Sequence, residues 1–106
     1  MSNNRGTSTA LTLNDVLRIL RDHLPALREK YAVKSLAVFG SYVRGEQRRR
    51  SDVDVLVEFD VAPDLIRFIR LEDELRHAIG VDVDLVSRGS LRGKRGERIL
   101  HEAVPL

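Results

Sequence analysis

The stretch of residues 36–57 constrains the fold of this 106-residue chain most. An apolar run at 36–39 ends at a Gly-Ser pair, and after a polar, basic connection an apolar alternation begins with Asp52. A glycine at the end of an apolar run favours a turn, and strict alternation is typical of a half-buried strand. The stretch therefore predicts a strand, a tight turn, and a second strand that carries two acids, Asp52 and Asp54.

The two acids share one face of the second predicted strand. Successive side chains of a strand point to opposite faces, so Asp52 and Asp54 lie on one face and Val53, Val55 and Val57 on the other. Two carboxylates roughly 7 Å apart on one strand repel each other, which raises the proton affinity of both. A divalent cation such as Mg²⁺ would remove that repulsion, and it binds through a few carboxylates together with substrate phosphates. The pair therefore indicates a metal-nucleotide site.

Gly40 and Ser41 supply a second half for such a site. A glycine where a strand breaks into a turn allows close approach of the backbone to a ligand, and the amides that follow can point at phosphate oxygens. Ser41 adds a hydroxyl group. Gly-Ser pairs occur in ordinary turns, so the prediction depends on the two acids of the next strand.

These residues resemble a known family. Gly-Ser-x-x-Arg-Gly at 40–45 and Ser-Asp-x-Asp-x-Leu-Val at 51–57 are similar to the signature of the DNA polymerase beta-like nucleotidyltransferase superfamily. The short length resembles its minimal nucleotidyltransferase branch. One departure is Val43, where the family often has alanine, and this is a small apolar change. The matching positions are Gly40, Ser41, Arg44, Gly45, Ser51, Asp52 and Asp54.

A third acid is expected on a third strand at 81–86. Asp82 and Asp84 share one face of that strand, so strand phase does not separate them. In the resembled family a third acid within a pattern like Val-Asp-Leu-Val completes the metal site, and residues 83–86 match that pattern, which favours Asp84. The resemblance thus implies one or two Mg²⁺ ions, with ATP as substrate. It implies catalytic and metal-binding roles for Asp52, Asp54 and Asp84, and nucleotide-binding roles for Gly40, Ser41, Arg44 and Ser51.

The remaining pattern predicts an α/β (α+β) fold: a single nucleotidyltransferase-type domain at 11–106, with a mixed sheet of three or more strands flanked by helices, after a flexible tail at 1–10. A first helix, capped by Thr12 or Asn14, should kink or restart near His23-Leu24, with Pro25 in the first turn of the second piece. The strands are expected at 35–39, 52–59 and 81–86. A helix from a cap at Asp64 to a stop at Gly80 joins the last two strands. Glycines 89, 93 and 96 weaken any helix before Glu97, so a short terminal helix is expected only after that point.

Composition excludes several classes of protein. The 18 basic and 16 acidic residues give a net charge of only +2, which indicates no particular partner. The absence of cysteine excludes disulfide and thiolate chemistry. No apolar run approaches the roughly 20 residues that a membrane span needs, and the N-terminus lacks the apolar core of a signal peptide. We therefore expect a cytoplasmic protein without a membrane segment.

Two basic segments allow more than one interpretation. The arginines at 48–50 are either a solvated run, or one or two of them reach toward a triphosphate or an anionic acceptor. Five basic residues at 88–98 can form a patch for phosphate, RNA or an acidic partner. Because no aromatic residue lies among them, a base-stacking platform is not favoured, and direct nucleic-acid binding stays a secondary interpretation.

Minimal nucleotidyltransferases of this kind are antitoxins encoded beside a helical HEPN-domain ribonuclease toxin. The resemblance implies transfer of AMP from ATP to a tyrosine of a cognate HEPN toxin, with which the chain would form a hetero-oligomer. One alternative is an inactive antitoxin that neutralises its partner by binding alone. Another is a nucleotidyltransferase that acts on RNA or a small molecule, although a 106-residue chain leaves no room for an acceptor domain.

Overall fold

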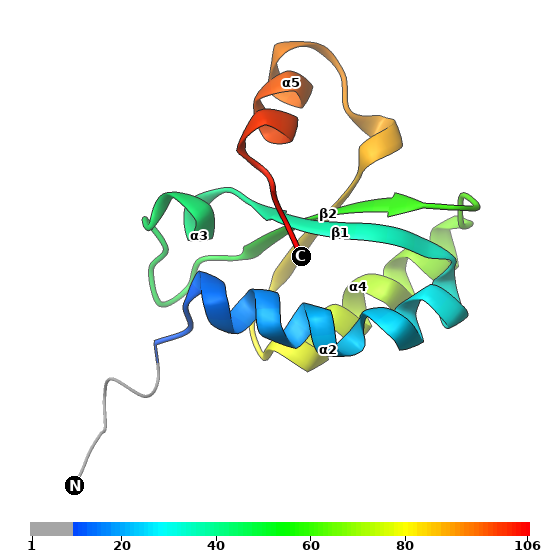
Figure 1. The fold of residues 1–106 in the computed structure, drawn as a ribbon, viewed down its shortest axis with the longest axis horizontal. Helices are drawn as coiled ribbons and strands as arrows, with labels where there is room; N and C mark the ends of the chain where they lie inside the picture. Colours follow the sequence, from blue (N-terminus) through cyan, green and yellow to red (C-terminus); the bar gives the residue numbers. More distant parts are fainter. Residues whose placement is uncertain (1–9) are drawn as a thin grey trace, which may run out of the picture.

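The computed structural model describes residues 10–106, which form a four-stranded mixed sheet covered by helices on both faces (Figure 1). The strands are β1 (Val33–Phe39), β2 (Val53–Phe59), β3 (Val83–Ser87) and β4 (Val104–Pro105), and their order in the sheet is β3-β2-β1-β4. β1 pairs antiparallel with β2 and β4, whereas β2 pairs parallel with β3. The predicted α+β fold with a mixed sheet, and the internal position of the first strand, are therefore confirmed.

Two helices, α2 (Leu13–Tyr31) and α4 (Leu65–Ile79), cover one face of the sheet (Figure 1). Alternate residues of the strands point toward them, so that Val53, Val55 and Val57 of β2 are fully buried. Apolar residues of the two helices at spacings of three and four complete this main core. The helical residues that are most deeply buried there are Val16, Leu20, Leu27, Leu71 and Leu75.

Helix α2 begins with a reciprocal cap. The Thr12 hydroxyl accepts a hydrogen bond from the Asp15 amide at 3.2 Å, and the Asp15 carboxylate accepts one from the Thr12 amide at 3.0 Å. The helix then runs through Pro25, so the predicted second start near that residue is wrong. Leu20 and Leu27, on either side of the exposed Pro25, are both buried against the sheet, and their packing outweighs the one backbone hydrogen bond that proline removes.

Helix α4 has the predicted ends. The Asp64 carboxylate accepts a hydrogen bond from the Arg67 amide at 2.8 Å, and Gly80 ends the helix with a φ of 88°. The strand that follows begins at Val83 rather than at residue 81. Most of the predicted tail lies outside the described residues. No helix in residues 10–106 is long and apolar enough to cross a membrane.

The opposite face of the sheet is partly covered by α5 (Gly93–Glu102), which follows the short helical turn η2 (Arg88–Ser90) (Figure 1). Ile99 packs there with Phe39 and Leu56 in a second, smaller core. The predicted terminal helix is present, but it begins at Gly93 although glycines 93 and 96 weaken it, and Gly96 is buried within it. A Cβ atom at Gly96 would lie 3.0 Å from Cβ of Leu91, so this glycine allows the helix to pack against the preceding segment. The chain then adds β4, which the sequence pattern did not predict.

Candidate active site

Asp54 and Asp84 are paired positions on the parallel strands β2 and β3. Their neighbours Val53, Val55, Val83 and Leu85 point into the main core with α2 and α4, so the two acids project from the other face, the one that α5 only partly covers. Asp52 immediately precedes β2 and is exposed. The structure thus brings the third predicted acid directly beside Asp54.

The pKa of Asp54 reports how closely the acids interact. Burial, then the charge of Asp84 and then that of Asp52 raise the pKa of the half-buried Asp54 carboxyl from 3.8 to about 6, although the Arg44 guanidinium opposes this. Repelling carboxylate oxygens are suitable ligands for a hard divalent cation, which would favour the charged form of Asp54. Within residues 10–106, however, no three acidic or histidine side chains are already arranged around one metal position. The donor set therefore fits Mg²⁺ by its chemistry, and the side chains have to converge when an ion binds.

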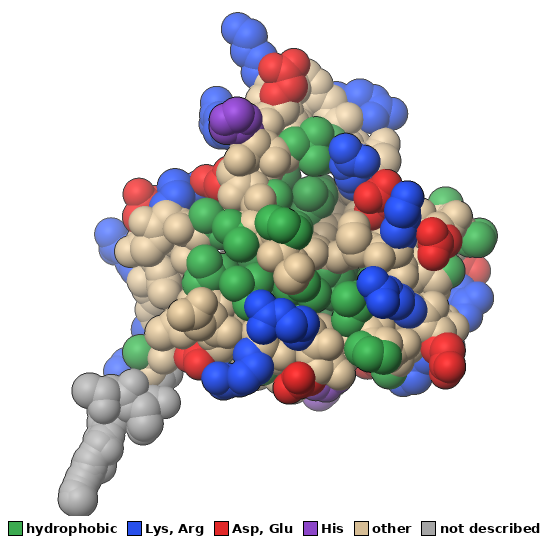
Figure 2. Space-filling view, viewed as in Figure 1, with side chains coloured by type: hydrophobic (Ala, Val, Ile, Leu, Met, Phe, Trp, Pro, Cys, Tyr) green, Lys and Arg blue, Asp and Glu red, His purple; other side chains and the backbone are tan. Residues whose placement is uncertain are grey.

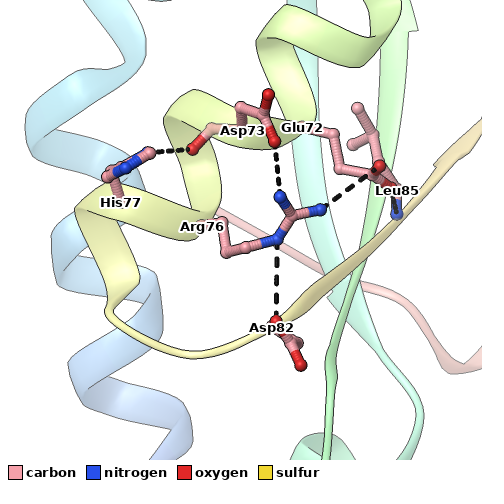
Figure 3. Close-up of polar contacts among 6 residues, drawn as sticks. All are labelled: Glu72, Asp73, Arg76, His77, Asp82 and Leu85. Carbon is pink, nitrogen blue, oxygen red and sulfur yellow. Dashed lines mark hydrogen bonds and ion pairs between the residues drawn. The ribbon is translucent and has the colours of Figure 1, made fainter.

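The structure separates Asp82 from Asp84. Asp82 precedes β3, its side chain is 79% exposed, and it lies 3.7 Å from Nε of Arg76 on α4 (Figure 3). The same arginine also contacts Asp73 and Glu72, and Glu72 accepts a hydrogen bond from the Leu85 amide at 3.2 Å. Since β3 is an edge strand, this contact satisfies an amide that has no neighbouring strand. Asp82 thus belongs to a network that ties α4 to β3, and Asp84 is the acid beside Asp54.

Gly40 packs directly against Asp54. It follows β1, has a φ of 81°, and precedes the single helical turn α3 (Ser41–Arg44). A Cβ atom at this position would lie 2.0 Å from Oδ2 of Asp54, so both the backbone conformation and the available space require glycine. Tyr42 is buried in the main core and anchors α3 there. The predicted bend is therefore in contact with Asp54, one of the three predicted acids.

Glu102, at the end of α5, is a component of this site that sequence reasoning missed. Its Oε2 accepts a hydrogen bond from the Gly40 amide at 2.9 Å, and its Oε1 accepts one from Nη1 of Arg44 at 2.6 Å. Partial burial raises the pKa of Glu102, but hydrogen bonds from Arg44 and Gly40 outweigh burial and hold that pKa below its usual value. The available signal was weak: Glu102 lies three residues after the buried Ile99, on the helix side that faces the sheet.

Comparison with known proteins decides the family. Residues 20–106 match the family model of the nucleotidyltransferase domain. The chain belongs to this nucleotidyltransferase family. This nucleotidyltransferase is 46% identical to the protein adenylyltransferase MntA of Thermococcus cleftensis. The alignment extends over 94 residues and covers 89% of this chain and 95% of that protein.

Two solved structures are similar to this nucleotidyltransferase. One is a chain of a toxin-antitoxin crystal structure with AMP-PNP, with 29% identity and a TM-score of 0.66 over 90% of this chain and 72% of that chain. The other is a chain in the complex of tri-AMPylated Shewanella oneidensis HEPN toxin with MNT antitoxin, with 25% identity and a TM-score of 0.56 over 87% of this chain and 66% of that chain. The predicted resemblance to the minimal nucleotidyltransferases is confirmed.

The other predicted nucleotide-binding residues of this nucleotidyltransferase occupy different settings. Ser41 is half-buried and directly follows Gly40. Ser51 closes the turn before the acids, because its hydroxyl accepts a hydrogen bond from the Arg48 amide at 2.7 Å and its own amide donates to the Arg48 carbonyl at 3.0 Å. Ser51 therefore has a structural role in fixing the approach to Asp52, whatever it binds in addition.

The two basic segments lie at the surface. The side chains of residues 48–50 are exposed beside the turn that leads into Asp52. In the later segment, Arg88 lies 3.4 Å from Glu58, and Arg92 donates to the carbonyls of Gly89 and Leu91. Lys and Arg side chains project from the part of the molecule that carries α5 (Figure 2).

Proposed function

We propose that this nucleotidyltransferase transfers AMP from ATP to a tyrosine hydroxyl of a cognate HEPN-domain toxin and thereby acts as its antitoxin, in a hetero-oligomer with that toxin. The observation that carries the proposal is the pairing of Asp84 with Asp54 next to the Gly40 bend. The names of the similar proteins support the choice of reaction and partner, since one is a protein adenylyltransferase and another is an MNT antitoxin in complex with an AMPylated HEPN toxin.

Each residue has a distinct role in this proposal. Asp52 and Asp54 would hold the metal that accompanies the nucleotide, and Asp84 would help to hold a second ion and would orient or deprotonate the acceptor hydroxyl. Bound Mg²⁺ would supply electrostatic stabilisation of the charge that develops on the phosphates during transfer. Ser41 binds the β- and γ-phosphates, Gly40 allows the backbone to approach them closely while its amide stays bonded to Glu102, and Arg44 adds a positive charge. The tyrosine oxygen forms a bond to the α-phosphorus as the bond to the β-phosphate breaks and pyrophosphate leaves.

The test is an intact-mass measurement. The purified chain is mixed with Mg²⁺, ATP and the product of the neighbouring gene, and the mass of that partner should increase by one or more AMP units. Replacing the modified tyrosine with phenylalanine should abolish the increase. An unchanged partner mass with the wild-type chain, in which every predicted ligand is intact, would contradict the proposal.

A second candidate is neutralisation by binding alone. One comparison favours it: a similar chain belongs to a structure in which an MNT antitoxin is in complex with a HEPN toxin. The double substitution Asp52→Asn and Asp54→Asn separates the two candidates, because it removes two acids without changing side-chain size. Full neutralisation of the toxin by this variant in cells would favour binding alone, whereas loss of neutralisation with retained complex formation would favour catalysis.

A further inference from the structure

The carboxylate of Glu102 joins the two ends of the α3 turn. Its two oxygens bind different groups, the Gly40 amide at 2.9 Å and the Arg44 guanidinium at 2.6 Å. Gly40 precedes α3 and Arg44 is its last residue, so one carboxylate fixes both ends of the turn that follows β1. The Glu102 side chain is only 19% exposed, which makes these charge-assisted bonds stronger than a pair in open solvent.

Gly40 needs such a partner. It is buried and lies just after the end of β1, and its amide donates to Glu102 rather than to a neighbouring strand. An unpaired amide in a buried position is costly, so Glu102 stabilises the bend as well as orienting it. The bend lies against Asp54, where a Cβ atom would overlap Oδ2, and any movement of Gly40 would therefore disturb that acid.

The contacts of Arg44 leave one end of its guanidinium available. Nε donates to Glu46 at 2.9 Å and Nη1 donates to Glu102 at 2.6 Å. No hydrogen bond or ion pair within residues 10–106 uses Nη2. A guanidinium that is held at two of its nitrogens keeps a fixed orientation, and the third nitrogen can then donate to an incoming anion.

We propose that Glu102 is a positioning residue for the nucleotide phosphates: through Gly40 and Arg44 it holds the α3 turn in the conformation that binds them. This role rests on the proposed function, since it concerns the same site. Glu102 itself does not touch the nucleotide in this proposal. Its negative charge is offset by the Arg44 guanidinium to which it is bonded.

The test compares Glu102→Gln and Glu102→Ala with two controls. Glu97→Gln removes a charge from an exposed position on the same helix, and Glu46→Gln removes the other partner of Arg44 without touching Gly40. We expect KM for ATP to rise about tenfold in the Glu102 variants, with kcat changed much less, and Glu102→Asp to be intermediate. Glu97→Gln should match the wild type. Glu46→Gln, which weakens one of the two contacts that hold Arg44 but leaves the Gly40 amide paired with Glu102, should raise KM by less than the Glu102 variants do.

A second measurement needs no nucleotide. Hydrogen exchange of the Gly40 amide, followed by NMR on the free protein, should be about tenfold faster in Glu102→Ala than in the wild type and unchanged in Glu97→Gln. A Gly40 amide that exchanges at the same rate, or a KM that stays constant or falls in both Glu102 variants, would overturn the positioning role alone. A wild-type chain that neither binds ATP nor modifies its partner would overturn the proposed function, and this role with it.

Discussion

Asp84 lies directly opposite Asp54 on the neighbouring parallel strand, on the sheet face that points away from α2 and α4. The pairing is maintained from outside the site, because Glu72 of α4 accepts a hydrogen bond from the Leu85 amide and so holds β3 at the sheet edge (Figure 3). Two carboxylates are thus kept beside each other by the packing of the sheet. When both are charged, their repulsion lowers the free energy of unfolding.

The first prediction concerns the effect of the Asp54 charge on the stability of the free protein. The pKa of Asp54 is raised in the folded state from 3.8 to about 6, so its contribution to stability is fully present below pH 3.8 and is lost as the pH rises through about 6. Asp54→Asn removes the charge and should raise the melting temperature of the free protein by a few degrees at pH 8. At pH 4 the difference should nearly vanish, because Asp54 of the folded wild type is then protonated. Thermal unfolding of both proteins at pH values from 4 to 8 measures the difference in melting temperature.

Asp60→Asn is the matched control for this prediction, because Asp60 is an exposed acid in the loop after β2. It should leave the melting temperature within about a degree of the wild type across the same pH range. An Asp54→Asn variant that is less stable than the wild type at pH 8 would show that the charged acid stabilises the free protein, which contradicts the cost of burying that charge and placing it beside Asp84.

The second prediction separates the two acids near the start of β3. Asp84→Asn should lower AMP transfer at least a hundredfold, because it removes the carboxylate that lies beside Asp54. Asp82→Asn should lower transfer by no more than about threefold, since Asp82 is mostly exposed and faces Arg76. The rate of partner modification is followed by mass spectrometry. Equal losses in the two variants would mean that the register of β3 does not select the functional acid.

Much of this arrangement could be predicted from the chain itself. The alternation that begins at Asp52 predicts both the strand and the face of its acids, and the caps at Thr12, Asp64 and Gly80 predict helix ends, because these signals are local. The choice between Asp82 and Asp84 could not be made from strand phase, since both share that phase. It depends on the pairing of β3 with β2 and on the contact of Asp82 with Arg76, which are tertiary facts.

The errors have the same origin. Pro25 and Gly96 are poor helix residues by local propensity, yet the helices run through them because Leu27 is buried on the sheet and Gly96 packs on Leu91. Glu102 was missed because its partners, Gly40 and Arg44, are about sixty residues away in the chain. Long-range contacts of this kind leave no periodic signal in a single sequence.

The third prediction concerns metal and nucleotide together. A ligand that binds only the folded state stabilises it, by about 2.7 kcal/mol at a hundredfold excess over Kd. Mg²⁺ with ATP should therefore raise the melting temperature of the wild type by several degrees, and removal of Mg²⁺ with EDTA should abolish most of that rise. Asp54→Asn should show little rise at all. A variant that responds as strongly as the wild type would remove the argument for a metal site at these acids.

The fourth prediction uses two glycines that both have positive φ but differ in ψ and in surroundings. Gly40 has φ 81° and ψ -151°, a region that is essentially restricted to glycine, whereas Gly45 has φ 72° and ψ 25°, in the left-handed helical region that other residues adopt at a cost of about 1 kcal/mol. A Cβ atom at Gly40 would lie 2.0 Å from Oδ2 of Asp54, whereas at Gly45 it would meet no atom within 4 Å. Gly40→Ala should therefore lose at least twice as much unfolding free energy as Gly45→Ala in urea titrations. It should also abolish AMP transfer, while Gly45→Ala retains it. Equal destabilisation by the two substitutions would mean that neither the backbone conformation of Gly40 nor its contact with Asp54 makes glycine more necessary at position 40 than at position 45.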